Sequence, residues 1–546
     1  MEQQGGGDPQ GSMEQGKVTL RDRLSDGWKN PFNVSSGRIS QAVIASVIIF
    51  VVAFIVRAVG LSRGFELWVD EMRYADLGRS VSLGQLPNLA DGPFFLHPPG
   101  FFLLEAAVID IFRLSSEGME LVYQLRWVNV VLGSLSAALT FLLVLKLTRA
   151  KVAFVAAVVV VFEPFVLRNN SHVMLETLGV TAMLAGLLII VDREPRRSWV
   201  RLGLGGLLLG CAVVTKDVFA VGVFLPIVIA LVWRVTLTRR EALVVLTGAV
   251  VPYCLYLVVL TADGTLAQWW GVKFGGMLRM VGISQSTGFN APGAPSLIER
   301  LLAQSSQYGT SYVLLTLTPL AGAIACFSQR RDRRLVGLTA LSMGFFGMYA
   351  AMFGTFEENY GYAVLMTGVP AIAVCLVEVL ERRPALRRPI IAISAIPVLA
   401  VTALGIRAEL TTDDGFLKVQ EWMSANLPAD ARVGITNDTG RVAFTHDPRF
   451  GVWPSASLLA QHDADYVLTQ SLPTSQGYGY TTPAMLDWLA GHAIPVISVS
   501  GPTNGTTVLW AVPGSPGSAL KVAAQQAIGD RHPRSTAPRE SPQSGQ

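Results

Sequence analysis

Long apolar segments recur along most of this chain, and they constrain its fold more than any other feature. A transmembrane helix needs about 20 predominantly apolar residues to cross roughly 30 Å of hydrocarbon. With 51% hydrophobic and 15% charged residues, the chain is too apolar for a soluble protein of its length. The sequence therefore predicts an all-α polytopic membrane protein with about eleven transmembrane helices. These are expected at 40–60, 127–145, 151–167, 173–191, 200–215, 218–235, 241–261, 307–327, 335–353, 360–380 and 389–406.

The basic residues between these segments indicate how the chain is oriented. Placing the N-terminus in the cytoplasm puts five short basic connectors on the cytoplasmic side, as the positive-inside rule requires. They are 146–151, 192–199, 234–240, 330–334 and 381–388. Residues 97–113 are also apolar, but counting them as a span would reverse every later connector. We therefore expect a helix or re-entrant element along the outer leaflet, inside one large external loop at 62–126.

The remaining segments complete the predicted organisation. Residues 1–38 and 516–546 are expected to be disordered, and 39–406 form the membrane domain. The polar segment 262–306 is either an ordinary surface loop or a cover or acceptor-binding loop over the site. From 407 to 515 the pattern predicts a small extracytoplasmic α/β domain, with strands near 432–436, 465–468, 495–500 and 506–512. The last two strands flank Gly501–Gly505, which indicates a hairpin turn.

An acid pair follows the first apolar segment. Asp70 and Glu71, with Tyr74 one turn later, would lie at the outer membrane surface. Adjacent carboxylates are costly there, because water is scarce and like charges repel. They could be solvated acids at a helix start, where anions are favoured. Alternatively, one of them is a general base whose proton affinity is set by its neighbour.

Cations and further acids are expected on the same side. Arg126 and Lys216 could be interfacial residues that snorkel, or they could bind a phosphate. Arg168 is a weaker phosphate candidate, and His97 in His97-Pro98-Pro99 could touch a phosphate or cap the next helix. The other candidates for substrate binding are Glu176, Glu357, Glu358 and Tyr360.

Several classes of function are excluded by what the sequence lacks. It contains no Walker A motif, no dinucleotide fingerprint and no zinc-ligand spacing such as HExxH. The glycines Gly206 and Gly210 form a GxxxG pair that indicates close helix packing. We expect no obligatory cofactor and no nucleic-acid partner, while a divalent cation is possible.

A sugar donor used on the outer face would have to be held by the membrane, and a polyprenyl phosphate fits that requirement. Its phosphate leaves readily, because the second pKa is about 6.

These residues resemble those of the GT-C superfamily, in the group that contains dolichyl-phosphate-mannose protein mannosyltransferases and bacterial aminoarabinose transferases. The matching positions, in order, are Asp70-Glu71, His97–Pro99, Arg126, Glu176 and Lys216. The resemblance implies that Asp70 is the catalytic base, that Glu71 supports substrate binding, and that Arg126 and Lys216 bind the lipid phosphate. It also implies inversion at the anomeric carbon. His-Pro-Pro is followed by Gly100-Phe101 and no sugar-binding repeat is inserted at 262–306, so a protein acceptor is not implied.

The sequence thus predicts a plasma-membrane glycosyltransferase with an extracytoplasmic active site and C-terminal domain. It would move mannose or a pentose such as arabinose from a polyprenyl-phosphate donor to a cell-envelope glycan, lipid or secreted protein. Two other classes stay open: a transporter or flippase for a polyprenyl-linked or anionic solute, and a non-catalytic envelope assembly protein. Transporters concentrate charged sites near mid-membrane, whereas these residues gather at one face.

Overall fold

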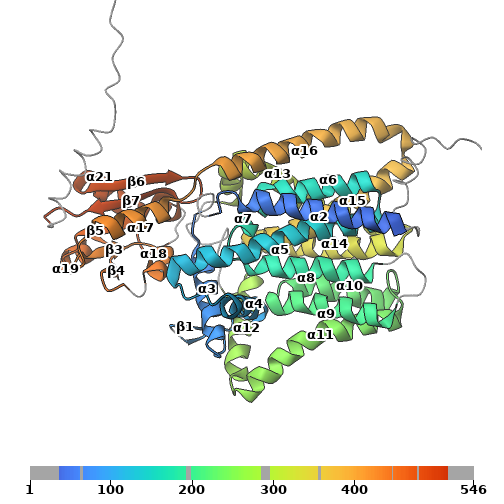
Figure 1. The fold of residues 1–546 in the computed structure, drawn as a ribbon, viewed down its shortest axis with the longest axis horizontal. Helices are drawn as coiled ribbons and strands as arrows, with labels where there is room; N and C mark the ends of the chain where they lie inside the picture. Colours follow the sequence, from blue (N-terminus) through green and yellow to red (C-terminus); the bar gives the residue numbers. More distant parts are fainter. Residues whose placement is uncertain are drawn as a thin grey trace, which may run out of the picture.

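The computed structural model describes residues 36–61, 66–90, 92–191, 198–284, 296–353, 358–444, 447–475 and 479–514. Of the two expected disordered segments, only residues 36–38 fall within these ranges, where they begin the first helix. A helical bundle fills most of the described chain, and a smaller α/β domain sits at one of its ends (Figure 1). We call this end of the bundle the domain end and the other the opposite end.

The bundle consists of long apolar helices and shorter ones beside them. Its helices are α2 (Ser36–Ala58), α5 (Gly118–Leu147), α6 (Ala150–Phe162), α7 (Pro164–Asn170), α8 (Leu175–Ile190), α9 (Trp199–Thr215), α10 (Phe219–Trp233), α11 (Arg239–Ala262), α13 (Leu297–Cys326), α14 (Arg331–Met352), α15 (Glu358–Arg382) and α16 (Arg387–Leu410), with a 3-10 turn at Pro384–Leu386. By length and composition, seven of the described helices can each cross a membrane, or eight if the bent pair α6–α7 is one span. Three shorter apolar helices, α8, α9 and α10, lie among them. Each segment expected to span therefore falls on helices of this bundle.

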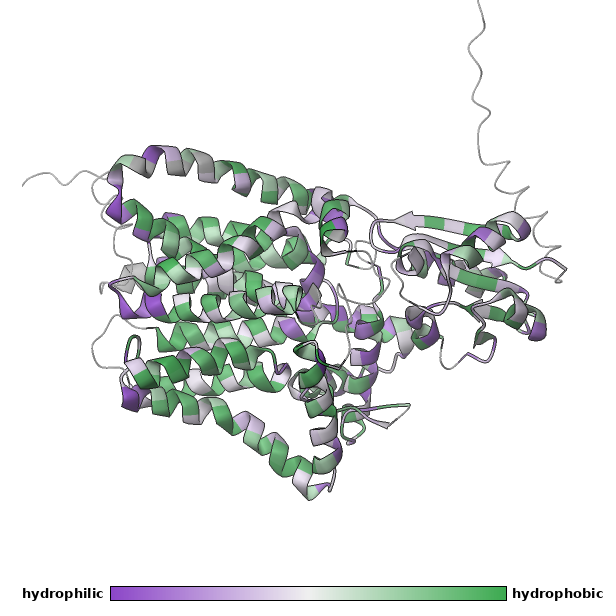
Figure 2. Ribbon diagram, turned by 180° about the vertical axis from the view of Figure 1, so that it is seen from behind, coloured by the Kyte–Doolittle hydropathy of each residue, from purple (hydrophilic) through white to green (hydrophobic). Residues whose placement is uncertain are grey.

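Polar residues gather at the two ends of the bundle, while its middle is hydrophobic (Figure 2). At the opposite end, Lys146 donates hydrogen bonds to the carbonyls of Leu188 (3.0 Å) and Val191 (2.8 Å). Arg333 donates to the Leu147 carbonyl (3.0 Å) and pairs with Glu378 (2.6 Å). Four of the predicted basic connectors, 146–151, 234–240, 330–334 and 381–388, thus meet at this end of the bundle, far from the α/β domain. Most of the fifth, 192–199, lies outside the described residues.

Glycines allow the close approach of helices that the sequence predicted. A Cβ atom at Gly206 would lie 2.3 Å from the Val245 carbonyl oxygen, and one at Gly210 would lie 2.4 Å from that of Ala249. Side chains at these positions would therefore push α9 away from α11. The GxxxG pair is confirmed as the contact between these two helices.

Between α2 and α5 the chain forms a compact segment at the domain end. It contains α3 (Val69–Ser82), a two-stranded hairpin of β1 (Asn88–Leu89) and β2 (Gly92–Pro93), and α4 (Gly100–Phe112). The apolar segment 97–113 thus forms the short helix α4 and is not among the helices long enough to span. Its Glu105 is fully buried against Gly78 of α3, and burial raises the pKa of this carboxyl well above its usual value. Glu105 therefore packs α4 against α3.

The segment 262–306, expected to be a polar loop, contains a helix. This helix, α12 (Leu266–Met280), follows α11 directly. Along its length, Trp270, Phe274 and Met277 are exposed, whereas Trp269 is buried. The charged and glycine residues of the segment concealed this amphipathic pattern.

The α/β domain contains one mixed sheet. Its strand order is β4-β3-β5-β7-β6, in which β3 pairs in parallel with β4 and β5, while β7 is antiparallel to β5 and β6. The expected hairpin is present as β6–β7, with Gly501 paired to Gly505. The elements are α17 (Gly415–Asn426), β3 (Val433–Ile435), α18 (Asp438–Ala443), β4 (Phe450–Val452), α19 (Ala456–Gln461), β5 (Tyr466–Gln470), α20 (Ser471–Ser475), α21 (Pro483–His492), β6 (Ile494–Gly501) and β7 (Gly505–Ala511).

The α/β domain shares a hydrophobic core with the segment that carries α3. Buried Met72 and Tyr74 of α3 and Leu125 of α5 belong to one cluster with Phe416 and Leu509 of the domain. Removing such side chains from water supplies most of the stabilisation in a protein interior. The α/β domain is therefore packed onto α3 and fixes its position.

Candidate active site

The two adjacent acids of α3 lie in different environments. Both occupy the first turn of the helix, where the backbone dipole favours negative charge. Asp70 is partly exposed, whereas Glu71 is fully buried. One Glu71 oxygen, Oε1, accepts a hydrogen bond from the backbone N–H of Trp68 (3.0 Å). Glu71 therefore stabilises the helix start, while Asp70 is the more accessible of the two carboxylates.

Glu71 and Arg126 form a buried, two-pronged ion pair. Arg126 donates from Nη2 to Oε1 (2.6 Å) and from Nε to Oε2 (3.0 Å), and its Nη1 donates to the Leu61 carbonyl (2.9 Å). Neither side chain is exposed. Burial raises the pKa of Glu71, but the Arg126 guanidinium outweighs it and holds the pKa below its usual value. The pair fixes α3 to α5 with a carboxylate that stays charged.

A second buried ion pair joins Glu176 to Lys216. Glu176 lies in the first turn of α8, and Lys216 ends α9. The Lys216 ammonium contacts Glu176 Oε1 and lies 5.0 Å from the centre of the Tyr360 ring. Within the described chain, the other Glu176 oxygen, Oε2, is buried and accepts no hydrogen bond. This oxygen is available to a hydroxyl group of a bound molecule.

The turn between α7 and α8 connects the two ion pairs. The backbone N–H of Val173 donates to Glu71 Oε2 (3.2 Å), three residues before Glu176. The neighbouring His172 ring stacks on Trp68, with 4.6 Å between ring centres. Asn129 of α5 donates to the carbonyls of His172 and Met174 (2.5 and 2.8 Å). Both pairs are therefore held in one cluster at the domain end.

The His-Pro-Pro element lies beside Lys216. A Cβ atom at Gly100 would come within 2.8 Å of the Val214 carbonyl oxygen, so this glycine lets the start of α4 pack on the end of α9. The His97 ring contacts the ring of Tyr74 edge-on, at 6.0 Å between centres. Burial holds the pKa of His97 well below its usual value, and the positive charges of Lys216, Lys273 and Arg279 add to this effect. His97 thus lies near three basic side chains, which we call the cationic region, and two of them, Lys216 and Lys273, form ion pairs with Glu176 and Asp217.

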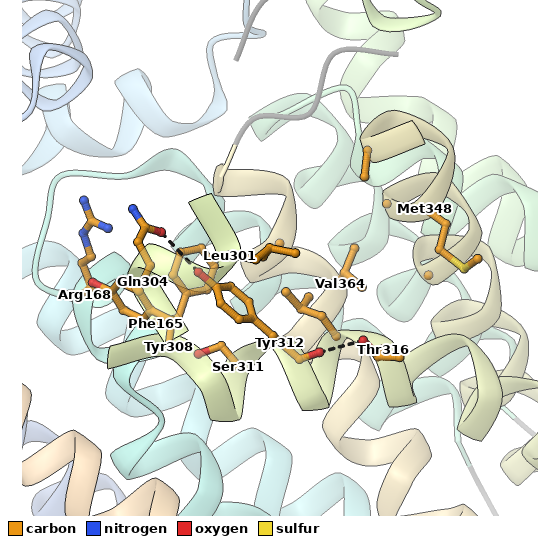
Figure 3. Close-up of a pocket in the computed structure, with 15 residues that line it drawn as sticks. Phe165, Arg168, Leu301, Gln304, Tyr308, Ser311, Tyr312, Thr316, Met348 and Val364 are labelled. Carbon is orange, nitrogen blue, oxygen red and sulfur yellow. Dashed lines mark hydrogen bonds between the residues drawn. The ribbon is translucent and has the colours of Figure 1, made fainter. Parts of the chain in front are cut away.

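An apolar cavity of about 230 Å³ begins near the same cluster. Its walls come from α7, α13, α14 and α15, and Figure 3 shows Arg168 and Gln304 at one end and Met348 at the other. The Arg168 guanidinium lies 4.2 Å from the centre of the Trp68 ring and 5.7 Å from that of Tyr308. The cavity thus runs from Arg168, which contacts Trp68 at the start of α3, into the bundle.

Comparisons with known proteins agree with this architecture. The sequence model of the dolichyl-phosphate-mannose-protein mannosyltransferases matches residues 115–271, a segment that holds Arg126, Arg168, Glu176 and Lys216. The structure of ArnT from Cupriavidus metallidurans bound to undecaprenyl phosphate is similar, with a TM-score of 0.52, 13% identity, and coverage of 88% of this chain and 99% of that one. The Archaeoglobus fulgidus oligosaccharyltransferase in its apo form has a TM-score of 0.50 and 14% identity, covering 86% of this chain and 75% of that one. Both are GT-C glycosyltransferases.

This chain has the GT-C fold. No curated protein matches it in sequence. The suspected resemblance to the GT-C superfamily is confirmed, as are the polytopic helical fold and the small C-terminal sheet region.

Most of the sequence-predicted site residues of this GT-C chain lie in the cluster at the domain end. Asp70 and Glu71 reach it from α3, Arg126 from α5, Glu176 from α8 and Lys216 from the end of α9. The nearby candidates are Tyr74, His97, Arg168 and Tyr360. The phosphate role expected for Arg126 stays a prediction, and its guanidinium is directed at Glu71 and a carbonyl. Glu357 and the side chain of Glu358 lie outside the described residues. Among the described residues no group of three His, Cys, Asp or Glu side chains could hold a metal ion, so a divalent cation has no ligand set there.

Sequence reasoning missed several residues that complete this GT-C site. Trp68 lies against the Arg168 guanidinium. Asn129 holds the turn before Glu176 through the carbonyls of His172 and Met174. Asp217 and Lys273 pair with each other beside His97 and Lys216. Trp68 stands two residues before Asp70, and Asp217 immediately follows Lys216, so proximity in the sequence was the one signal available for them. Lys273 stood in a segment that was expected to be a loop, and no pattern pointed to its partner.

Proposed function

We propose that this chain is an integral-membrane glycosyltransferase that uses a polyprenyl-phosphate sugar as donor and inverts the anomeric carbon. The sugar is mannose or a pentose such as arabinose, and the acceptor is a hydroxyl group of a cell-envelope glycan, lipid or secreted protein. One observation carries the proposal: an accessible carboxylate, Asp70, lies beside a buried carboxylate fixed by arginine, in the same cluster as the cationic region around His97 and Lys216.

Asp70 is the general base of the proposed reaction. The acceptor oxygen attacks the anomeric carbon while its proton passes to the Asp70 carboxylate, and the bond from that carbon to the phosphate oxygen breaks. Such a positioned base typically contributes a factor of about 10² to 10⁴ in rate. The Glu71–Arg126 pair supports this role, because it holds the first turn of α3 in place while leaving Asp70 partly exposed.

The leaving polyprenyl phosphate is stabilised by the cationic region. Its charge rises as the bond breaks, and preorganised cations stabilise that developing charge best in a site with little water. Lys216 is the nearest candidate to His97, with Arg168 at the mouth of the apolar cavity. Because the leaving group is a phosphate with a second pKa of about 6, no general acid is required.

The apolar cavity between α13, α14 and α15 is suited to the first isoprene units of the donor. Its lining is dominated by aromatic and aliphatic side chains, including Phe165, Leu315 and Val364. An alkyl chain gains about 0.8 kcal/mol for each buried methylene group. The similar fold of ArnT, whose structure contains undecaprenyl phosphate, supports this assignment.

Replacing Asp70 with asparagine tests the proposal. D70N keeps the size of the side chain but cannot accept the proton, so transfer from polyprenyl-phosphate-mannose or -arabinose should fall by at least about 10²-fold. Transfer is measured with purified protein in detergent, following the radiolabelled sugar.

The matched control is D110N, because Asp110 is an exposed aspartate on the adjacent helix α4. We expect D110N to retain wild-type transfer. Near wild-type transfer by D70N would refute the base assignment. Movement of labelled lipid across vesicles without any new glycosidic bond would favour a flippase.

A further inference from the structure

The helix α12 presents two different faces. Trp269 on one face is 8% exposed and packs with Phe95, Tyr256 and Leu260. On the other face, Trp270, Phe274 and Met277 are at least 50% exposed. Tryptophan and other large apolar residues on one side of a short helix are typical of a helix in the membrane interface.

Lys273 extends from the buried face of α12 toward the candidate site. Its ammonium donates a hydrogen bond to the Leu96 carbonyl (2.9 Å) and forms an ion pair with Asp217 Oδ2. The second Asp217 oxygen, Oδ1, accepts a hydrogen bond from the Tyr253 hydroxyl (2.7 Å). The Lys273 side chain is 12% exposed and that of Asp217 is 41% exposed. Charge-assisted hydrogen bonds of this kind are roughly twice as strong as those between neutral groups.

Each of these contacts is with a residue directly next to a candidate for phosphate binding in the sequence. Leu96 immediately precedes His97, and Asp217 immediately follows Lys216. One side chain therefore ties together two segments from different parts of the sequence, the His-Pro-Pro turn and the α9–α10 junction. Trp269 adds a second contact to the first of these through Phe95.

We propose that Lys273 is a positioning residue of the donor site, which fixes His97 and Lys216 relative to each other through the Leu96 carbonyl and Asp217. The exposed apolar face of α12 binds this helix to the membrane interface. The phosphate-binding residues are thereby kept at a fixed depth relative to the lipid surface. This inference rests on the proposed function. Lys273 acts through its neighbours, because its hydrogen bonds are directed at the protein and not at an open site.

The test compares K273M with D217N and with the double variant. K273M keeps the length of the side chain but removes the charge and the donor. We expect kcat/KM for the polyprenyl-phosphate donor to fall by about tenfold or more, while KM for the acceptor stays within about twofold. D217N should act in the same direction, and the double variant should be no worse than the more damaging single variant, because both remove one interaction. K273R should recover most of the donor use.

A matched control is K146M. Lys146 also donates to two backbone carbonyls, but at the opposite end of the bundle. Three results would each overturn the inference. The first is that K273M loses kcat/KM equally for donor and acceptor, and the second is that the losses of K273M and D217N multiply in the double variant. The third is that K146M shows the same loss of kcat/KM for the donor. If K273M does not accumulate in the membrane, D217N carries the test, since Asp217 is 41% exposed and its loss perturbs the interior less.

Failure of the proposed function would be recognised separately. If the wild-type protein transfers no sugar, the binding of polyprenyl phosphate is measured instead by its effect on thermal stability. The positioning role then predicts about tenfold weaker binding to K273M and unchanged binding to K146M. Equal binding to all three proteins would overturn it.

Discussion

Asp70 and Glu71 are neighbours with opposite tasks. Both Glu71 oxygens accept hydrogen bonds from Arg126 and from backbone N–H groups, and these contacts hold α3 in place. Asp70 is partly exposed, whereas Glu71 is fully buried. The resemblance implied that Arg126 binds the donor phosphate, whereas its guanidinium donates hydrogen bonds to Glu71 and to the Leu61 carbonyl.

Replacing Arg126 with alanine separates these two roles. A buried ion pair that loses one partner leaves an uncompensated charge, which costs about 3–5 kcal/mol. R126A should therefore lower the thermal stability of the purified protein strongly, and E71A/R126A should recover part of the loss. The control is R149A, because the Arg149–Glu381 pair spans 3.9 Å between exposed side chains and such pairs contribute at most about 1 kcal/mol. Unchanged stability of R126A with loss of donor affinity alone would instead support direct phosphate binding.

The limits of prediction at the residue scale have a physical cause. Asp70, Glu71, His97, Glu176 and Lys216 could be found because charge in or beside an apolar segment is costly and therefore informative. Their pairing could not be found, because Glu71 and Arg126 are 55 positions apart and nothing in the sequence measures that contact. The buried Glu105 shows the converse, since it is a costly charge position that turned out to pack α4 against α3.

At the scale of elements, the segment that enters α3 also forms the junction with the C-terminal domain. Glu66 accepts hydrogen bonds from the backbone N–H groups of Leu67 (3.0 Å) and Phe416 (2.9 Å), so it links the start of α3 to α17. Its carboxyl is 2% exposed, and burial raises its pKa to about 8, with a further contribution from the nearby Asp413. Burial also raises the pKa of Asp413.

This junction should make stability depend on pH. A carboxyl whose pKa is 4.5 in the unfolded chain and about 8 when folded binds a proton on folding between these values. Stability should therefore fall as pH rises from about 4.5 to 8, by at most about 1.4 kcal/mol per pH unit. E66Q should flatten this decline in the thermal stability of the purified protein. E421Q, which changes an exposed acid on α17, should not, and an unchanged slope in E66Q would contradict the assignment.

Elements were predictable where their periodicity was strong. The long apolar runs gave the bundle helices, and the alternating pattern around Gly501–Gly505 gave the hairpin. The helix α12 was missed because the glycines Gly271, Gly275 and Gly276 argue against a helix, and the three-residue strand β4 was too short to leave a pattern.

At the scale of the whole molecule, the basic connectors and the candidate site lie at opposite ends of the bundle. Lys146 and Arg333 hold the connectors together at one end, while the acid pair and the C-terminal domain occupy the other (Figure 1). The positive-inside rule assigns the first end to the cytoplasm. The candidate site would then face the compartment that contains no nucleotide sugars, which is why a lipid-linked donor is the consistent choice.

This orientation predicts which positions an impermeant reagent can reach in intact cells. A cysteine introduced by A484C lies on the exposed surface of α21 in the C-terminal domain, and one introduced by R240C lies in an exposed connector of the opposite end. A membrane-impermeant maleimide should label A484C in whole cells and label R240C only after the membrane is disrupted. The four native cysteines lie on apolar helices, so the unmodified protein gives the background. The reverse pattern would place the acid pair in the cytoplasm, where the proposed lipid-linked donor chemistry would lose its rationale.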